Sequence, residues 1–309
     1  MTQRPTVVLT AAFPAVARDL LSEDFDVVEH PTEHSRTEEE MMTILADADG
    51  AITLLSDPLT RRVLSSNPNL AIVANFAVGY NNIDIEAARN IGIVVTNTPG
   101  VLTEATADLT MALMLAVMRR IVEGDAEVRA TGRCEWEPLK LLGSSMQGKR
   151  LGIIGMGRIG SAVAARAYVF GMEVVHHSRG RGMPLDELLA TSDVVSLHVP
   201  LTAETRHIID RDALASMKKG SFLVNTSRGP LVDEAALCDA LESGHLRGAA
   251  LDVYEEEPAV NPRLLTRRDV VIVPHIGSAT EEARNGMARI EPTEIVRFFR
   301  RQPPLHAVT

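Results

Sequence analysis

The stretch 151–160, LGIIGMGRIG, decides the fold of this chain, because a short apolar run breaks directly into the pattern Gly155-x-Gly157-x-x-Gly160. An apolar strand that ends in glycines and opens a helix presents backbone N–H groups and the positive end of the helix to a pyrophosphate. Alone, the glycine pattern is a weak signal, since tight turns supply it by chance. Here an expected helix, 159–170, and a second expected strand, 173–177, complete a βαβ unit. The sequence therefore predicts a dinucleotide site, with a purely structural turn as the alternative.

The end of the second expected strand indicates which dinucleotide binds. An NAD site usually offers Asp or Glu to the adenosine ribose about 20 residues after the glycines, whereas this chain reads HHSRGR at 176–181. The hydroxyl of Ser178 and the guanidiniums of Arg179 and Arg181 would accept a 2′-phosphate that a carboxylate would repel. We therefore expect a preference for NADP(H). A solvated basic loop without ligand contact is the alternative, and use of NAD(H) stays open.

Length and charge bound the class of protein. The 309 residues exceed one typical domain, so we expect two. A net charge of −10 argues against nucleic acid or an anionic membrane as partner. The N-terminal residues do not resemble a secretory signal, and the longest strongly apolar helical run, 111–118, is too short to span a bilayer. These features predict a cytoplasmic protein, and the spacing of its histidines predicts no metal site.

Strand-like runs alternate with helical ones along the chain, which predicts an α/β architecture with parallel sheets covered by helices. The expected strands are 7–10, 27–29, 51–55, 72–75 and 93–96, followed by 151–154, 173–177, 194–198, 221–225, 248–252 and 270–273. Between the two groups, TNTPG at 96–100 is the expected hinge. One long helix is expected from 103 to about 130, apolar around most of its circumference. Such a helix must be buried on several sides, within its own chain or against a second subunit. We expect a homodimer, with burial inside the monomer as the alternative.

Three further segments follow expected strands of the second group, and ligands usually bind at the carboxyl ends of parallel strands. They are NTSRGP at 225–230, DVYEEEP at 252–258 and PHIGS at 274–278. Arg228 offers a planar fork for the carboxylate of a 2-oxo acid. His275 suits proton donation during hydride transfer, and a nearby glutamate would favour the protonated imidazole. Each residue alone is more often a structural hydrogen bonder, but their combination beside a dinucleotide motif favours catalysis.

Five motifs, in order and spacing, resemble the D-isomer-specific 2-hydroxyacid dehydrogenase family over nearly the whole chain. They are VLTEATAD at 101–108, GMGRIG at 155–160, NTSRGPLVDE at 225–234, GAALDVYEEEP at 248–258 and PHIGSAT at 274–280. The resemblance implies that Arg228, Glu257 and His275 are catalytic. Glu257 is preferred over Glu255 and Glu256 because it directly precedes Pro258.

The resemblance also implies two Rossmann-like domains. A dinucleotide-binding domain at 100–285, with a dimerisation helix, would be inserted into a flavodoxin-like substrate domain made of 1–99 and 286–309. Pro292 departs from the family pattern, because it falls in the expected C-terminal helix, where only the first turn would tolerate it without cost.

The segment NFAVGYNNID at 75–84 is similar to the substrate loop of the family, in which the backbone N–H groups of Val78 and Gly79 would hold the substrate carboxylate alongside Arg228. Its Val-Gly form and the Ser-Arg-x-Arg strand end indicate the glyoxylate and hydroxypyruvate reductase branch. Leu54, His275 and Trp136 complete the implied substrate site. Trp136 would reach into the active site of a partner subunit, or else lie buried in its own interface. The implied cofactor-binding residues, besides Ser178, Arg179 and Arg181, are Thr106, Gly155, Gly157, Arg158, Ile159, Gly160, Val199, Pro200, Thr205, Thr226, Ser227, Asp252 and Gly277.

The sequence thus predicts an NADPH-preferring reductase that converts glyoxylate and hydroxypyruvate into D-2-hydroxy acids. A bulkier oxo acid, such as 2-ketogluconate or phenylpyruvate, is the alternative within the enzyme class. Outside it, the alternative is a nucleotide-sensing corepressor-like protein that shares the fold and the three catalytic positions. The acidic balance of the chain speaks against that second alternative.

Overall fold

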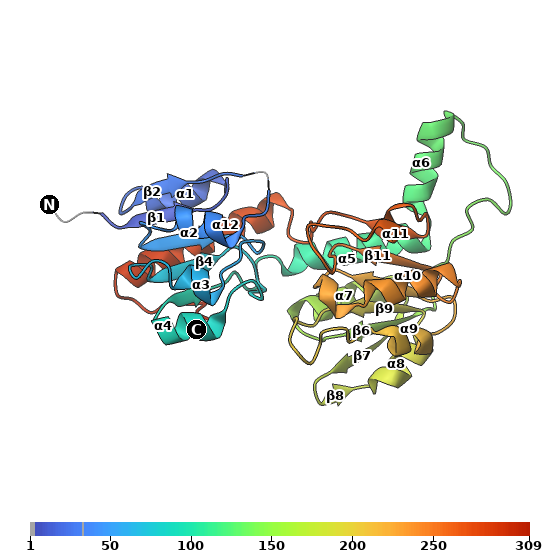
Figure 1. The fold of residues 1–309 in the computed structure, drawn as a ribbon. Helices are drawn as coiled ribbons and strands as arrows, with labels where there is room; N and C mark the ends of the chain where they lie inside the picture. The colour runs from blue at the N-terminus through green and yellow to red at the C-terminus, as the bar shows by residue number, and fades with distance from the viewer. Residues whose placement is uncertain (1–3, 33) are drawn as a thin grey trace. The chain divides into compact units, whose positions relative to one another are not determined.

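The computed structural model describes residues 4–32 and 34–309, which divide into two compact α/β units (Figure 1). The first unit holds the residues up to Leu102 together with Ser278–Thr309, and the second is Thr103–Gly277. The expected bounds at 99/100 and 285/286 fall a few residues away from these crossings. The second crossing comes earlier than expected because Thr280 caps the helix α12 (Glu281–Phe299), whose Ala283 is already buried and whose Gly286 lies against Val101.

The first unit is built on a five-stranded parallel sheet with the order β2-β1-β3-β4-β5. Its strands are Thr6–Leu9, Asp26–Glu29, Gly50–Thr53, Ile72–Asn75 and Val94–Thr96 for β1 to β5, and its other helices are α1 (Ala15–Leu21), α2 (Glu38–Ile44), α3 (Arg61–Leu64) and α4 (Ile85–Ile91). Helices α2, α3 and α4 bury one face of the sheet, where Val8, Ala51 and Val73 meet Met41 and Val63. Helices α1 and α12 cover the other face. Both faces are therefore apolar, as a parallel sheet requires.

Pro292 lies in the interior of α12 and not in its first turn. A proline there removes the N–H that would bond to Ala288 O, a loss that costs about 3 kcal/mol in a helix interior. Pro292 is buried, and α12 packs along its length on α1, β3 and β4. Tertiary packing therefore holds the helix together across a residue that would break it in isolation.

The second unit contains a seven-stranded sheet with the order β12-β11-β10-β9-β6-β7-β8, in which all neighbours are parallel except β7 and β8. Its strands are Arg150–Ile154, Glu173–Ser178, Arg181–Gly182, Val194–Leu197, Phe222–Asn225, Gly248–Leu251 and Val270–Ile272 for β6 to β12. The two-residue strand β8 was not expected from the sequence. Strands β7 and β9 lie on opposite sides of β6, so the order in which strands are added to the sheet reverses at β6. Open α/β sheets bind their ligands at such a topological switch point.

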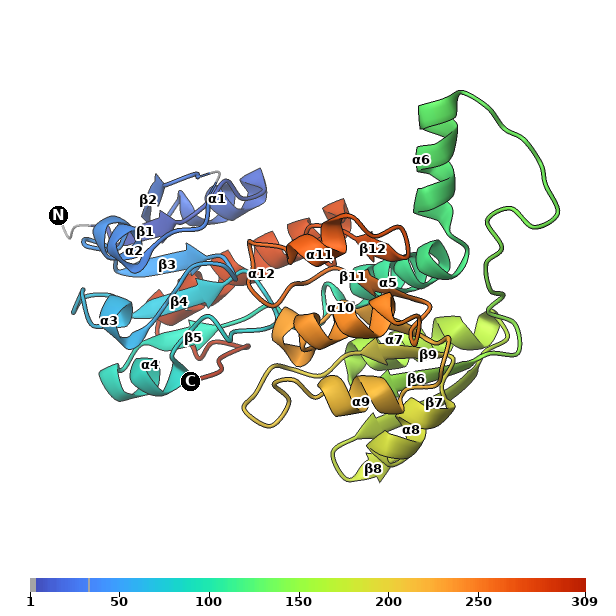
Figure 2. The ribbon, with the colours of Figure 1, turned by 45° about the vertical axis from the view of Figure 1, so that its right-hand side comes forward.

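Helices cover both faces of this sheet (Figure 2). Residues of α5 and α7 pack on one face and residues of the remaining helices pack on the other. The helices are α5 (Thr103–Met118), α7 (Arg158–Val169), α8 (Leu185–Thr191), α9 (Arg211–Ser216), α10 (Glu234–Glu242) and α11 (Pro262–Leu265), with a 3₁₀ turn at Gly229–Leu231. The predicted α/β architecture, with Rossmann-like parallel sheets covered by helices, is confirmed.

The single long helix expected from 103 to about 130 is wrong, because the chain breaks after Met118 into α5 and α6 (Ile121–Thr131). Arg120 adopts a left-handed conformation with φ of 54°, and Met118 O accepts a hydrogen bond from Ser144 N in place of continuing the helix. Helix α6 and the loop that follows it project from the body of the second unit in both views (Figures 1 and 2). Ile121, Val122 and Val128 are exposed on it, an unusual density of apolar side chains for a helix in water.

None of the helices in residues 4–32 and 34–309 is long and apolar enough to cross a membrane.

Candidate active site

The glycine-rich turn connects β6 to α7 at the switch point of the second sheet. Gly155 has φ of 100°, and a Cβ there would lie 2.5 Å from His198 O. A Cβ on Gly160 would lie 2.1 Å from Gly155 O, so helix α7 approaches the end of β6 as closely as only glycine permits. Gly157 differs, because a Cβ at this N-cap position meets no atom within 4 Å. The open space in front of Gly157 and of the helix N-terminus fits a pyrophosphate that approaches the backbone.

Ser178, at the end of β7, lies beside this turn, and its hydroxyl accepts a hydrogen bond of 3.1 Å from Met156 N. Arg181 pairs with Ser178 across the antiparallel β7–β8 ladder, and Arg179 lies in the turn between them. Both arginines are exposed. The carboxylate of Glu204 lies close enough to Arg179 for the two charges to interact. A hydrogen bond from Thr202 lowers the pKa of Glu204 most, and the charge of Arg179 lowers it further. The strand end itself carries cations and a hydroxyl, which suit a phosphate group.

The other candidate cofactor-binding residues follow the neighbouring strands at the same edge of the sheet. Val199 and Pro200 follow β9, and their carbonyls accept hydrogen bonds from Ser227 Oγ (2.6 Å) and Thr205 Oγ1 (2.7 Å). Across the sheet the remaining threonines bond within the unit, Thr226 to Thr110 (2.9 Å) and Thr106 to Gly277 O (3.0 Å). Helix α7 begins at Arg158 and Ile159. The second unit therefore gathers the predicted cofactor-binding residues at the carboxyl-terminal ends of its strands and at the helix ends beside them.

His275 and Glu257 form a pair after β12 and β11. The distance from His275 Nδ1 to Glu257 Oε2 is 3.0 Å, and the second carboxylate oxygen accepts a hydrogen bond of 2.9 Å from Tyr254 N. Burial acts to raise the pKa of Glu257, but the hydrogen bond and charge of His275, the Tyr254 N–H and Arg228 together outweigh it and lower that pKa. An ionised carboxylate only accepts hydrogen bonds, so Nδ1 carries the proton of the pair and Nε2 is left for another partner.

Arg228 follows β10 and lies close enough to Glu257 for its positive charge to lower the pKa of that carboxylate. Its guanidinium donates a hydrogen bond of 2.7 Å from Nη1 to Ser227 O. Burial lowers the pKa of Arg228, and the carboxylate of Glu257 opposes that effect. An arginine stays protonated despite such a shift. The structure therefore brings together the predicted Arg228, Glu257 and His275.

Asp252 holds the loop that carries His275. Its carboxylate oxygens accept hydrogen bonds from Ile276 N (2.6 Å) and Gly277 N (2.8 Å), and burial raises the pKa of Asp252 to about 6. His275 itself adopts φ of 51°, a conformation uncommon for a residue with a side chain. The two bonds to Asp252 hold the backbone directly after His275 in one conformation.

A second support, which the sequence did not reveal, holds the loop of Glu257. Glu255 N donates to Glu234 Oε1 at 2.6 Å, and Glu234 N donates to Glu255 Oε2 at 3.2 Å. His207 Nε2 lies 2.6 Å from the other oxygen of Glu255. Burial raises the pKa of Glu234. Glu234 follows the helix-capping Asp233 and looks like an ordinary first-turn acid, so nothing in its local pattern indicates this role.

The substrate candidates Leu54, Val78 and Gly79 lie in the first unit, after β3 and β4. Leu54 N donates to Asp57 Oδ2 at 2.8 Å. The carbonyls of Val78 and Gly79 accept hydrogen bonds from Asn97 Nδ2 (2.7 Å) and Asn75 Nδ2 (3.0 Å). Within residues 4–32 and 34–309, by contrast, the N–H groups of Val78 and Gly79 have no hydrogen-bond partner. Two adjacent free donors suit the binding of a carboxylate.

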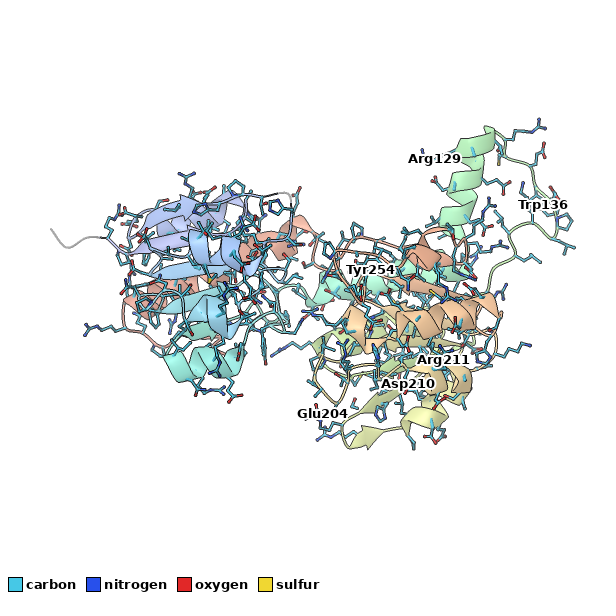
Figure 3. The ribbon with its side chains drawn as sticks, in the orientation of Figure 1. Arg129, Trp136, Glu204, Asp210, Arg211 and Tyr254 are labelled. Carbon is cyan, nitrogen blue, oxygen red and sulfur yellow. The ribbon has the colours of Figure 1, made fainter. Side chains whose placement is uncertain are left out.

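Trp136 lies on the loop after α6, where 84% of its surface is exposed (Figure 3). The second unit does not bring it to the sheet edge that holds the other candidates. Among the residues that the structure describes, no group of three or more His, Cys, Asp or Glu side chains is arranged to hold a metal ion.

Comparison with known proteins identifies the family. Residues 111–277 match the sequence model of the D-isomer specific 2-hydroxyacid dehydrogenase NAD binding domain. The chain is 43% identical over 320 residues to the glyoxylate reductase of Thermococcus litoralis, covering 99% of this chain and 97% of that protein. The chain belongs to the D-isomer-specific 2-hydroxyacid dehydrogenase family. It is an oxidoreductase that depends on a nicotinamide dinucleotide, as the sequence predicted.

Solved structures agree with this assignment. The TT0316 protein of Thermus thermophilus is 44% identical and has a TM-score of 0.94 over 98% of this chain and 100% of that chain. The NADPH-dependent glyoxylate/hydroxypyruvate reductase of Sinorhizobium meliloti, solved with NADP and malonate, is 32% identical and has a TM-score of 0.86 over 99% of this chain and 97% of that one.

Proposed function

We propose that this protein is a reductase of small 2-oxo acids, glyoxylate and hydroxypyruvate first, that prefers NADPH and forms D-2-hydroxy acids. The observation that carries the proposal is the pair of His275 and Glu257, 3.0 Å apart, with Arg228 beside it at the sheet edge that also holds the glycine-rich turn. Relatives support the substrate class, since proteins 43% and 45% identical to this chain are named glyoxylate reductases.

Each residue of the triad has one task in the proposed reaction. The nicotinamide cofactor, when bound at the glycine-rich turn, would supply the hydride that reduces C2 of the oxo acid. Arg228, a cation with a planar fork, binds the carboxylate and draws electron density from the carbonyl oxygen. Glu257 accepts the Nδ1 proton of His275 in a hydrogen bond and opposes the charge of the imidazolium, so that Nε2 donates its proton to the developing alkoxide. The free N–H groups of Val78 and Gly79 would bind the substrate carboxylate, and Leu54 is a further substrate-binding residue in the proposal.

The preference for NADPH rests on Ser178, Arg179 and Arg181 at the end of β7. A 2′-phosphate would form ion pairs as well as charge-assisted hydrogen bonds with the two guanidiniums, whereas the uncharged 2′-hydroxyl of NADH brings no negative charge for them to pair with. The matched test replaces Arg179 and Arg181 together with glutamine. We expect the KM for NADPH to rise at least tenfold and the KM for NADH to change little. Equal changes for both cofactors would refute the assignment of the two arginines.

A homodimer is part of the proposal. Ile121, Val122 and Val128 on α6, together with Trp136, Leu139 and Leu142 on its loop, are exposed in the single chain, and burial against a second copy removes them from water. In the dimer, Trp136 reaches the active site of the partner subunit. The mass in solution tests the dimer, and a rise in the KM for hydroxypyruvate in Trp136→Ala, with the dimer intact, tests the contribution to the site.

The first experiment is the initial rate of absorbance loss at 340 nm with glyoxylate or hydroxypyruvate, measured with NADPH and NADH in parallel. Turnover that favours NADPH supports both the substrate class and the cofactor preference. Turnover confined to phenylpyruvate or 2-ketogluconate would replace the substrate but keep the mechanism. Absence of turnover on every oxo acid, together with cofactor-dependent capture of a protein partner, would favour a nucleotide-sensing role.

A further inference from the structure

The substrate loop of the first unit is held through its peptide planes. Ala77 O accepts a hydrogen bond from Thr98 N at 3.0 Å, and Val78 O accepts one from Asn97 Nδ2 at 2.7 Å. A carbonyl and the N–H of the next residue share one rigid plane. The bond to Ala77 O therefore orients the N–H of Val78, and the bond to Val78 O orients the N–H of Gly79. The two donors expected to bind the substrate carboxylate are thus aimed by two consecutive residues, Asn97 and Thr98.

Asn97 and Thr98 are in turn positioned by the segment 303–309. Asn97 N donates to His306 O at 3.3 Å, and Thr96 and Ala307 form an antiparallel bridge. Val308 N donates to Val95 O at 2.8 Å, and Val95 N donates to Thr309 Oγ1 at 3.2 Å. The segment therefore continues the first sheet beyond its edge strand β5, next to the residues that hold the substrate loop.

Helix α12 anchors this segment through a buried carboxylate. Glu294 is 1% exposed, and its two oxygens bond to Leu305 N and His306 Nδ1, each at 2.7 Å. Arg297 donates two further hydrogen bonds, of 2.8 and 3.0 Å, to Pro303 O. A buried carboxylate is costly unless its lone pairs are satisfied, so the contacts of Glu294 define one position for the segment.

We propose that Asn97 is a positioning residue for substrate binding and that the segment 303–309, clamped by Glu294 through His306, holds it in place. The chain of contacts runs from Glu294 to His306, to Asn97, to Val78 O, and ends at the N–H of Gly79. The inference rests on the proposed function, since it takes Val78 and Gly79 to bind the carboxylate of the oxo acid. It assigns to a segment more than 200 positions away in sequence a share in the affinity for substrate.

The test compares Asn97→Asp with Asn90→Asp, an exposed control on α4 with the same change of charge. The Asn97→Asp protein loses the amide donor and turns a carboxylate oxygen toward Val78 O. We expect its glyoxylate KM to rise about tenfold or more, because the misaligned N–H of Gly79 would lose its charge-assisted hydrogen bond to the substrate carboxylate. Its kcat should stay within about threefold and its Kd for NADPH, from fluorescence, should stay unchanged. His306→Ala, which removes only the bond to Glu294, should raise the KM by a smaller factor.

Amide hydrogen exchange of peptides covering 75–84 supplies a readout that needs no substrate. Asn97→Asp and deletion of 303–309 should speed exchange in this loop, whereas Asn90→Asp should not. Unchanged exchange overturns the inference whatever the activity, and faster exchange with an unchanged KM overturns its link to substrate binding. Failure of the proposed function is separate, because it shows as absence of turnover in the wild-type protein before any variant is compared.

Discussion

Two alanine substitutions in the glycine-rich turn should have opposite consequences, because one glycine faces protein and the other faces open space. In Gly160→Ala the new Cβ would lie 2.1 Å from Gly155 O, more than 1 Å inside ordinary contact. The obstacle is a backbone atom and has no rotamer by which to escape. In Gly157→Ala the new methyl meets no atom within 4 Å, and φ of −81° is an ordinary value for alanine.

The sign of the effect at Gly160 decides between two physical arguments. Helix propensity alone favours alanine by about 1 kcal/mol, whereas forcing an extra methyl into a packed contact costs about 1–3 kcal/mol and sometimes more. A clash with immobile backbone lies at the upper end, so we expect net destabilisation of about 2 kcal/mol. For a unit of this size that lowers Tm by roughly 4–8 °C. Gly157→Ala should keep Tm or raise it slightly, because alanine restricts the unfolded chain.

Cofactor affinity should separate the variants in the other direction. The methyl of Gly157→Ala occupies the space through which a pyrophosphate approaches the backbone, so we expect the Kd for NADPH to rise at least tenfold in a fully folded protein. Calorimetry gives Tm and quenching or enhancement of NADPH fluorescence gives Kd. Wild-type affinity in Gly157→Ala would refute the placement of the pyrophosphate, and wild-type Tm in Gly160→Ala would refute the packing argument.

Three further changes test the pair of His275 and Glu257 and one buried acid, Glu291. His275→Ala should lower kcat by roughly two to four orders of magnitude, the size of a general-acid effect, and wild-type turnover in that variant would exclude the residue as the proton donor. Glu257→Gln keeps an acceptor for Tyr254 N but loses the charge opposite His275, so kcat should fall about 10- to 100-fold with little change in Tm; a fall no larger than twofold would contradict the role of that charge. Burial raises the pKa of Glu291 well above its usual value, so this group favours folding at pH 4 and that contribution is lost as pH rises through the raised pKa. Glu291→Gln should therefore match the wild type near pH 4 and have the higher Tm at pH 8, and parallel Tm profiles would show that the carboxyl does not take up a proton on folding.

Local pattern was sufficient for much of this protein. The alternation of apolar runs with amphipathic segments predicted both parallel sheets, and the glycine spacing predicted the turn at the switch point, because these features depend on residues close in sequence. The loops of Arg228, Glu257 and His275 were predicted to converge because parallel strands end at one edge of a sheet. The family resemblance then distinguished Glu257 from its two acidic neighbours.

Other features depended on contacts that no local pattern contains. The break between α5 and α6 follows from Ser144, which bonds to Met118 O across a loop, and Pro292 stays inside a helix because packing on the first sheet outweighs its local cost.

The sequence by itself was sufficient to predict which residues the proposal uses, since the chemical type of each side chain and the strand that it follows can be taken from the sequence alone. Only the tertiary structure decided what holds them. Asp252 holds the loop of His275, Glu234 holds the loop of Glu257, and Asn97 with the segment 303–309 holds the loop at 75–84, each through hydrogen bonds between distant parts of the chain. Such bonds form only when folding has already removed the partners from water, so their energy and direction belong to the folded state alone.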